Sequence, residues 1–288
     1  MSRSQLEAPH ATEVAGEAAA AAGSAAERAG VVVRPLESLS ELDAGSRLIS
    51  RIWSDGDGEP KAPTSLLRAL SYAGNFVAGA FRDGELVGVS LGFFGFEESE
   101  LHLHSHITGV DPEFQGKSLG FALKQFQRSW TLERGARTIL WTADPLVRGN
   151  AFFNLVKLGA VMVDYHENFY GLLEDGLNAG GDSDRVVLRW DLASERSVRA
   201  AAGALGEPRA GDGCVVLRAG DDGGPVTSNA EGDVLLAWVP EDIVRVREGD
   251  PERARAWRRA LRETVGRPLS EGFHADAITR DGWLTLTR

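Results

Sequence analysis

The stretch that most constrains the fold of this chain runs from His102 to Arg134. Alternating residues up to Val110 predict a β-strand, and the apolar residues beyond Ser118 recur at the spacing of a helix. Between the two lies a turn of small and polar residues, Gln115 to Gly120. Such a turn leaves backbone N–H groups unpaired at the positive end of the helix dipole, where a phosphate can approach them. The stretch therefore predicts a strand, an anion-binding turn and a helix.

The turn has competing interpretations. Gly116-Lys117-Ser118 looks like the end of a Walker A loop, but that motif needs a glycine five residues before Gly116, where Asp111 stands. A nucleotide-binding loop of that type is therefore excluded. A polar strand-to-helix turn without any ligand stays open as the alternative to an anion site.

The turn resembles the coenzyme A loop of the GNAT superfamily of acyl-CoA-dependent N-acyltransferases. The signature of that loop is Gln or Arg, two residues, Gly, one residue, then Gly or Ala. The residues that fit it are Gln115, Gly116, Lys117, Leu119 and Gly120. Ser118 stands where the pattern has its central glycine, and serine is a good helix N-cap.

A second motif, Asn150 to Ala160, also resembles the family. Ala151 and Lys157-Leu158-Gly159 match in register, and Asn150 lies near the usual Asn position. Leu155 replaces the tyrosine that protonates the departing thiolate in many members. The resemblance extends over about residues 31 to 192. In this range the chain is also similar to a subgroup of predicted acetyltransferases whose acceptors are mostly unassigned.

The resemblance implies an α/β fold with a GNAT-like mixed central sheet flanked by helices over residues 31–192. Within it, Ser38 and Glu41 form a capping box before a first helix, and Asp83-Gly84 predicts a hairpin between two apolar strands. Residues 193–288 are expected to form a C-terminal α/β extension. The expected elements of the extension are a strand at 234–239, a helix from Pro251 and strands at 274–279 and 283–287, after a loop-rich stretch at 200–224.

The predicted helix of the extension is rich in arginine. The arginines are Arg253, Arg255, Arg258, Arg259 and Arg262. Glu252 and Glu263 interrupt them, which favours a solvated helix face over nucleic-acid contact. Residues 1–30 are rich in alanine with scattered glutamates and lack the apolar run of a signal peptide. They have no evident apolar face, so a disordered tail is expected.

Composition narrows the class of partner. The formal charge of −11, from 31 basic and 42 acidic side chains, argues against a general binder of nucleic acid or anionic membranes and suits an amine-bearing partner. No stretch approaches the about 18 apolar residues of a membrane span. The single cysteine, Cys214, cannot form an internal disulfide, so a cytoplasmic location is expected.

The resemblance implies which residues contact acetyl-CoA or another acyl-CoA. A backbone N–H in the strand end 108–110 would meet the oxyanion, where the family pattern separates this strand from its neighbour. The expected cofactor-binding residues are Thr108, Gly109, Val110, Gln115, Gly116, Lys117, Ser118, Leu119, Gly120, Asn150 and Phe153.

Acyl transfer to an amine requires a neutral nucleophile, and an alkylamine with a pKa near 10.4 is mostly protonated at pH 7, so a base or a water chain is expected. His102, His104 and His106 alternate on one strand and share a face. His104 or His106 is the candidate base. A His-x-His metal site and structural histidines stay open as alternatives, and no metal is expected.

Other residues are candidates for the acid and for the acceptor. Tyr165 and Tyr170 are the nearest tyrosines downstream of Leu155, although each can equally be a sheet residue with its hydroxyl in water. Asp144 and Asn154 follow a strand end, where open α/β sheets place ligand groups, although Asp144 can also be a helix-start residue. Asp175 and Asn178 belong to a loop long enough to cover an acceptor.

The sequence thus predicts an enzyme that transfers an acetyl or other acyl group from acyl-CoA to an amine, with a small molecule as the expected acceptor. The alternative is a non-catalytic acyl-CoA-binding or sensing module, which Ser118 and Leu155 favour. A homodimer is compatible with either function.

Overall fold

The computed structural model describes residues 4–53, 61–171 and 183–288. The chain forms two compact units, each built from two segments. The first unit comprises Met1–Leu140 and Asp191–Ala202, and the second comprises Trp141–Trp190 and Gly203–Arg288. This division does not follow the expected boundary at residue 192. Each unit is described by itself.

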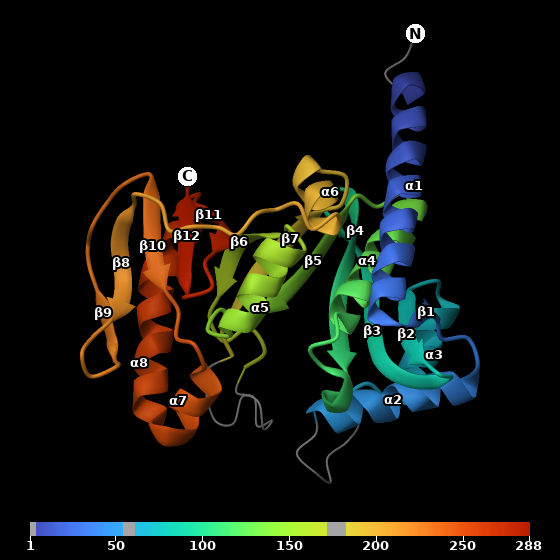
Figure 1. Cartoon of the computed structure of the whole chain (residues 1–288), viewed down its shortest axis with the longest axis horizontal. Helices are drawn as coiled ribbons and strands as arrows, with labels where there is room; N and C mark the ends of the chain where they lie inside the picture. Colours follow the sequence, from blue (N-terminus) through green and yellow to red (C-terminus); the bar gives the residue numbers. More distant parts are fainter. Residues whose placement is uncertain (1–3, 54–60, 172–182) are drawn as a thin grey trace. The chain divides into compact units, whose positions relative to one another are not determined.

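The sheet of the first unit has the strand order β1-β2-β3-β4-β5. Its strands are β1 (Val32–Pro35), β2 (Phe76–Arg82), β3 (Glu85–Glu97), β4 (Glu100–Val110) and β5 (Thr138–Ala143), the last of which continues into the second unit. The pairs are antiparallel except for β4 with β5, which is parallel. The sheet is therefore mixed, as predicted (Figure 1).

The hairpin between β2 and β3 closes through Asp83 and Gly84, whose φ angles are 51° and 85°. Two successive left-handed residues are typical of the two-residue turn that suits the twist of a hairpin. The predicted Asp-Gly turn is confirmed.

Helices cover both faces of this sheet. They are α1 (Ser4–Ala29), α2 (Leu39–Trp53), α3 (Thr64–Tyr72), α4 (Leu119–Glu133) and α6 (Glu195–Ala201), with a short 3₁₀ turn η1 (Pro112–Phe114) before α4. The predicted capping box forms at α2, because Ser38 Oγ accepts from Glu41 N and Glu41 Oε2 accepts from Ser38 N. Leu42, Ile49 and Leu67 then pack on Val89 in one core cluster.

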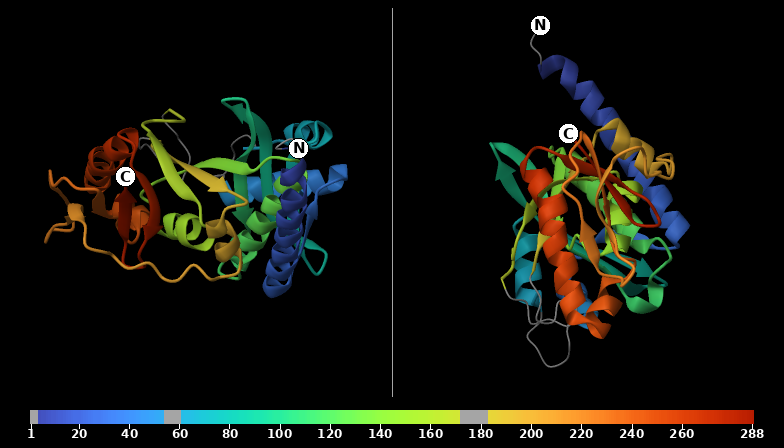
Figure 2. Two further views of the ribbon diagram at one scale, coloured as in Figure 1. Left: turned by 90° about the horizontal axis from the view of Figure 1, so that it is seen from above. Right: turned by 90° about the vertical axis from the view of Figure 1, so that its left-hand side faces the viewer.

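The expectation of a disordered tail is wrong for Ser4–Ala29, which forms α1. Ala18, Ala22, Ala25 and Ala29 are buried, and the last two share a core cluster with Leu119, Ala122 and Leu123. α1 runs beside α4 (Figures 1 and 2). Alanine favours a helix intrinsically, and a stripe of alanines gives a small apolar face that lets two helices approach closely.

The second unit has the strand order β7-β6-β11-β12-β10-β8-β9. Its strands are β6 (Val161–His166), β7 (Arg185–Asp191), β8 (Cys214–Ala219), β9 (Pro225–Thr227), β10 (Val234–Trp238), β11 (His274–Ile278) and β12 (Trp283–Thr287). Its helices are α5 (Arg148–Phe152), the π-helix η2 (Phe153–Lys157), α7 (Ile243–Gly249), α8 (Pro251–Leu261), the π-helix η3 (Arg262–Gly266) and α9 (Arg267–Ser270).

The strands and the helix predicted for residues 234–287 are present, and Pro251 is the first residue of α8. β8 lies inside the stretch 200–224 that was expected to be rich in loops, and β9 follows directly after it. β8 pairs in parallel with β10 and antiparallel with β9. β11 pairs with β6, so strands of the extension and strands before residue 192 belong to one sheet.

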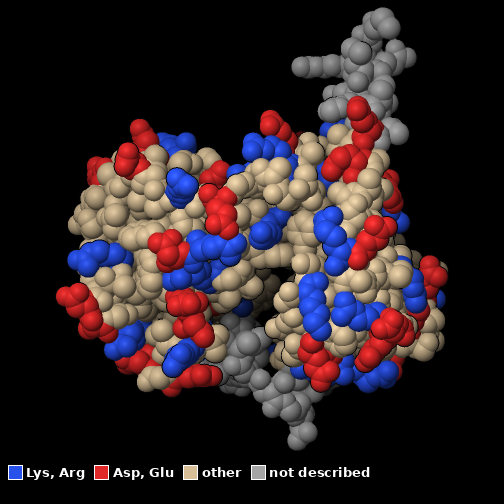
Figure 3. Space-filling model, in the orientation of Figure 1, with Lys and Arg blue, Asp and Glu red and all other residues tan. Residues whose placement is uncertain are grey.

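Acidic and basic side chains are interspersed on the face shown in Figure 3. Among the described residues, no helix is both long and apolar enough to cross a membrane.

Candidate functional site

The turn between β4 and α4 is shaped by two left-handed residues. Asp111 caps η1 by accepting from Glu113 N, and the chain then passes through Gly116 at φ 76° and Ser118 at φ 61°. The first backbone bond of α4 runs from Ala122 N to Ser118 O at 3.1 Å. Within the described parts of the chain, no backbone acceptor engages the N–H groups of Gly116 to Gly120. These groups lie at the positive end of the dipole of a 15-residue helix, as an anion site requires.

Ser118 is the N-cap residue of α4, but its side chain makes no capping hydrogen bond. The prediction that serine acts here as an ordinary side-chain cap is wrong, because such a cap needs an extended backbone and Ser118 is left-handed. A left-handed residue with a Cβ costs roughly 1–2 kcal/mol. The family pattern has a glycine here, and glycine adopts this conformation freely.

Cationic side chains lie close to the turn. Lys117 Nζ is 5.1 Å from the ring centre of Phe114, and the Arg82 guanidinium is 5.7 Å from the same ring. Gln115, Gly116, Lys117 and Ser118 are exposed. The turn therefore offers both unpaired N–H groups and positive charge to an anion.

The end of β4 separates from β5. Pairing runs from His102 with Thr138 to His104 with Leu140, and no later residue of β4 pairs with β5 in the described structure. Thr108 shares a hydrogen bond with Ser90. Gly109 is packed, because a Cβ there would lie 2.3 Å from the ring of Trp53. The strand end 108–110 thus has an unpaired edge, while α2 covers Gly109.

The histidines of β4 stand beside an aromatic ring. Phe93 stacks on His104 with ring centres 5.0 Å apart, and His106 lies 6.2 Å from His104. Leu91 pairs with Ile107 and Gly92 with Ser105, so His106 is the extra residue of a bulge. Among the described residues, no group of three His, Cys, Asp or Glu side chains could hold a metal ion.

Both histidines are uncharged at neutral pH. Burial, followed by the charges of His106, His102 and Lys124, lowers the pKa of His104 from 6.5 to about 4. Partial burial also lowers the pKa of His106. Each ring can accept a proton without first losing one, but as a weak base.

In the second unit, Tyr165 is engaged by a buried carboxylate. Its hydroxyl donates to Asp184 Oδ2 at 2.6 Å. Burial and this hydrogen bond raise the pKa of Tyr165 well above its ordinary value. The hydroxyl of Tyr170 shares a hydrogen bond with Thr142 Oγ1 at 3.1 Å, and its ring is exposed. Tyr170 is therefore the more accessible of the two candidate acids.

The helix after β5 carries the second motif. Asn150 is exposed, Phe153 is half-buried and Asn154 is buried. Leu155, at the position of the family tyrosine, is completely buried. This position holds a packing residue.

Asp144, which the sequence predicted as a contact of the acceptor substrate, is already hydrogen-bonded within the protein. Arg258 Nη1 and Nη2 donate to its two carboxylate oxygens at 3.0 and 2.9 Å, and Leu146 N donates to Oδ1. Asp144 therefore holds the turn before α5, which begins only at Arg148, and forms a nearly buried ion pair with Arg258. Asp175 and Asn178 lie outside the described residues.

The interpretation of the extension arginines as a solvated face is wrong for Arg258 and Arg262. Arg258 is only 7% exposed, and Arg262 donates to both oxygens of Asp184 at 2.7 and 2.8 Å. Burial acts the other way, but the bonds from Arg262 and Tyr165 hold the pKa of Asp184 below its ordinary value. Sequence distance hid these pairs, because each carboxylate lies before residue 192 and each arginine after residue 250.

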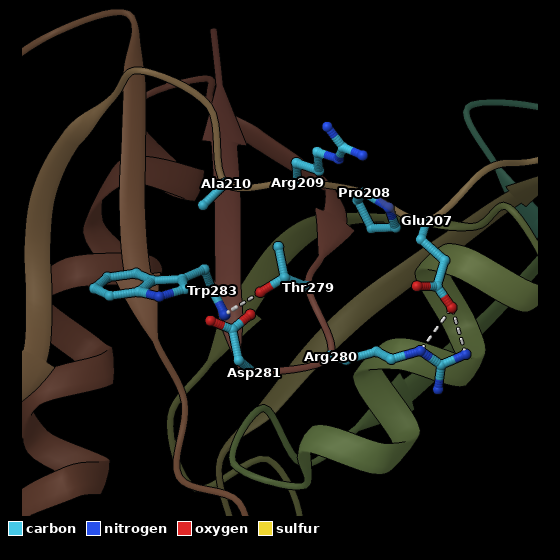
Figure 4. Close-up of a pocket in the computed structure, with 8 residues that line it drawn as sticks. All are labelled: Glu207, Pro208, Arg209, Ala210, Thr279, Arg280, Asp281 and Trp283. Carbon is cyan, nitrogen blue, oxygen red and sulfur yellow. Dashed lines mark hydrogen bonds and ion pairs between the residues drawn. The ribbon is translucent and has the colours of Figure 1, made fainter.

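A pocket of about 370 Å³ lies in the extension (Figure 4). Its lining residues are Glu207, Pro208, Arg209, Ala210, Thr279, Arg280, Asp281 and Trp283. Arg280 pairs with Glu207 at 2.6 Å across one end, and Thr279 Oγ1 accepts from Trp283 N. The pocket contains none of the site residues predicted from the sequence.

Sequence patterns missed two buried cations in α4. Lys124 is 4% exposed and Arg128 is 0% exposed. Arg128 donates to Leu192 O at 2.8 Å and pairs with Glu17 of α1 at 2.7 Å. If the sequence had shown that α1 packs on α4, it would also have indicated that polar side chains of α4, such as Arg128, are covered by α1.

These features describe a mixed α/β domain in which a turn with N–H groups that lack a backbone acceptor in the described residues joins a helix to a strand that separates from its neighbour. Residues 42–159 match the family described as Acetyltransferase (GNAT) family. The matched range includes the turn from Gln115 to Gly120 and the second motif up to Gly159.

Solved structures of acetyltransferases match part of the chain at low sequence identity. The ribosomal-protein-S18-alanine N-acetyltransferase from Escherichia coli is 14% identical with a TM-score of 0.45, over 57% of this chain and 95% of that chain. A GNAT acetyltransferase from Streptococcus pneumoniae is 13% identical with a TM-score of 0.46, over 55% and 98%. A GNAT acetyltransferase from Elizabethkingia anophelis with acetyl-CoA bound is 15% identical with a TM-score of 0.43, over 56% and 98%. Such low values say nothing of substrate, and no curated protein matches the sequence.

Proposed function

We propose that this protein transfers an acetyl or other acyl group from acyl-CoA to an amine, with a small molecule as the acceptor. The observation that carries the proposal is the turn from Gln115 to Gly120, in which the N–H groups of residues 116–120 have no backbone acceptor among the described residues. Such a turn suits the pyrophosphate of coenzyme A. The family match and the unpaired end of β4 support the same assignment.

The reaction forms a C–N bond and breaks a C–S bond. The amine nitrogen attacks the thioester carbonyl, the attacking nitrogen loses a proton, and coenzyme A leaves as a thiolate that gains one. His104 or His106 takes the proton from nitrogen, since both rings are uncharged at neutral pH. A weak base suffices, because holding the two substrates together can contribute ~7–11 kcal/mol.

The thiolate needs a proton donor other than Leu155, which has no ionisable group. Tyr165 is a poor donor, because its hydroxyl already donates to Asp184. Tyr170 or water fills this role. A single cysteine and a CoA co-substrate both suit the cytoplasm, which is the location we assign.

The alternative function is acyl-CoA binding without turnover. Two observations favour it: Ser118 is strained where the family has glycine, and Leu155 is buried where the family has its tyrosine. The two functions share the binding turn and differ in whether free thiol is released.

Binding is tested first, by calorimetry with acetyl-CoA. Gly120→Glu adds volume and negative charge at the start of α4, and we expect at least a tenfold loss of affinity, or about 1.4 kcal/mol. Gly206→Glu is the matched control, because a Cβ at Gly206 meets no atom within 4 Å. If the wild type and Gly120→Glu bind acetyl-CoA with equal affinity, the turn is not the cofactor site.

Turnover is tested by following free thiol from acetyl-CoA with a panel of small amines. Steady release beyond one equivalent per protein supports the transferase. Tight binding with no release above hydrolysis, for amines and for acyl chains of several lengths, supports the binding module instead.

A further inference from the structure

Lys124 is a buried titratable group that the proposed chemistry does not use. It lies in the middle of α4 and is 4% exposed. Its Nζ donates to Ser105 Oγ and to Gln127 Oε1, each at 2.9 Å. A buried ammonium is costly, so a lysine is a poor choice for packing alone.

Ser105 is the point at which this lysine meets the histidine strand. It stands between His104 and His106, it is 5% exposed, and it belongs to the bulge of β4. Successive residues of a strand point to opposite faces, so Ser105 faces α4 while His104 faces Phe93. The hydrogen bond from Lys124 to Ser105 therefore joins the bulged part of β4 to α4 on the face of the sheet opposite His104.

We propose that Lys124 is a positioning residue for His104 and His106, which it holds in place through Ser105 and whose protonation it opposes with its charge. The proposal concerns the base of the proposed acyl transfer and rests on that function for its catalytic meaning. The placement and the titration of the histidines can be measured without any substrate.

The electrostatic part follows from the groups around His104. The charged groups that face it are His102 and His106 on its own strand and Lys124 from α4. The paired segments of β3 and β5, residues 92–95 and 138–140, carry no titratable side chain. On α2, which also contacts β4, Arg51 pairs with Asp111 just beyond the strand.

Burial lowers the pKa of Lys124 itself to about 7. The lysine is therefore cationic throughout the range near pH 4 in which His104 titrates, and its repulsion is then fully present. Near neutral pH the lysine loses its proton, so its charge changes within the working range of an enzyme.

The test compares Lys124→Met, which keeps length and removes charge, with Lys157→Met, the same change at an exposed lysine. The pKa of the His104 ring is followed by NMR, with its signal assigned by its loss in His104→Gln. We expect an upward shift in Lys124→Met and no shift in Lys157→Met. With an amine acceptor, kcat should fall in Lys124→Met while affinity for acetyl-CoA is kept, and a purely structural lysine would leave the His104 pKa unchanged.

A second measurement keeps the proposal testable if Lys124→Met does not fold. In the wild-type protein, the His104 signal should show a small second step near pH 7 as Lys124 titrates. Absence of that step, or an unshifted His104 pKa in folded Lys124→Met, overturns the proposal. Failure of thiol release with both NMR results intact refutes the acyl transfer and leaves the positioning by Lys124 standing.

Discussion

Ser118 carries a conformational cost that a glycine would avoid. Its φ is 61° in the turn that starts α4, and its side chain makes no capping hydrogen bond that would offset the strain. The motif predicted the place of the turn, since the order of strand, small residues and helix is a local pattern. The backbone angle was not predictable, because a serine before a helix is usually an ordinary N-cap with an extended backbone.

We expect Ser118→Gly to raise the free energy of unfolding by ~0.5–1 kcal/mol, since relief of left-handed strain exceeds the entropy cost of a glycine. Urea denaturation measures the change. Ser65→Gly, on the exposed side of α3, should instead lower stability by up to ~1 kcal/mol. Destabilisation of the same size in both variants would contradict the strain.

The low pKa of His104 makes a prediction about pH. Its folded pKa of about 4 lies below the ordinary 6.5, so the ring stays uncharged down to about pH 4. If His104 is the base, kcat/KM with a fixed amine should lose activity on the acidic side near pH 4 rather than near pH 6.5. Persistence of that acidic limb in folded His104→Gln would assign it to another group.

At the scale of elements, the predictions that depend on residues close in sequence are confirmed, and the elements that depend on contacts distant in sequence were missed. The capping box at Ser38 and the Asp83-Gly84 turn were predictable, because every residue involved is close in sequence. α1 was not, since its alanines have a partner face only once α4 is in place. β8 was hidden in the same way, because its parallel partner β10 lies beyond the loop that follows it.

α1 is held by an ion pair as well as by its alanines. Glu17→Gln should lower the free energy of unfolding by about 1–3 kcal/mol, because it leaves the charge of the fully buried Arg128 without its carboxylate. Thermal denaturation gives the change. Glu13→Gln, at an exposed position of the same helix, is the matched control and should be neutral. Equal stability of the two variants would mean that α1 docks through its alanines alone.

At the scale of the whole molecule, the part of the extension from Gly203 to Arg288 forms one compact unit with Trp141–Trp190. Arg258 and Arg262 of the extension supply the partners of Asp144 and Asp184. The sequence predicted the strands β10, β11 and β12 and the helix α8 of this region. It could not predict their association, because ion pairs between residues over 70 positions apart leave no periodic pattern.

Arg258→Met should cost about 3–5 kcal/mol, since it leaves Asp144 as a nearly buried charge without its partner. Arg259→Met, on the exposed side of the same helix, should change stability by less than ~0.5 kcal/mol. Chemical denaturation of both variants tests this. Similar losses at the two positions would show that the helix, and not the ion pair, is responsible.

The path of the chain has a consequence for the order in which the protein can be completed during synthesis. The first unit needs Asp191–Ala202, which the ribosome makes only after the entire Trp141–Trp190 segment of the second unit. Until then Arg128 lacks the carbonyl of Leu192, and Arg137 O lacks the N–H of the same residue. The second unit in turn waits for Gly203–Arg288, so each unit is completed only after part of the other has been synthesised.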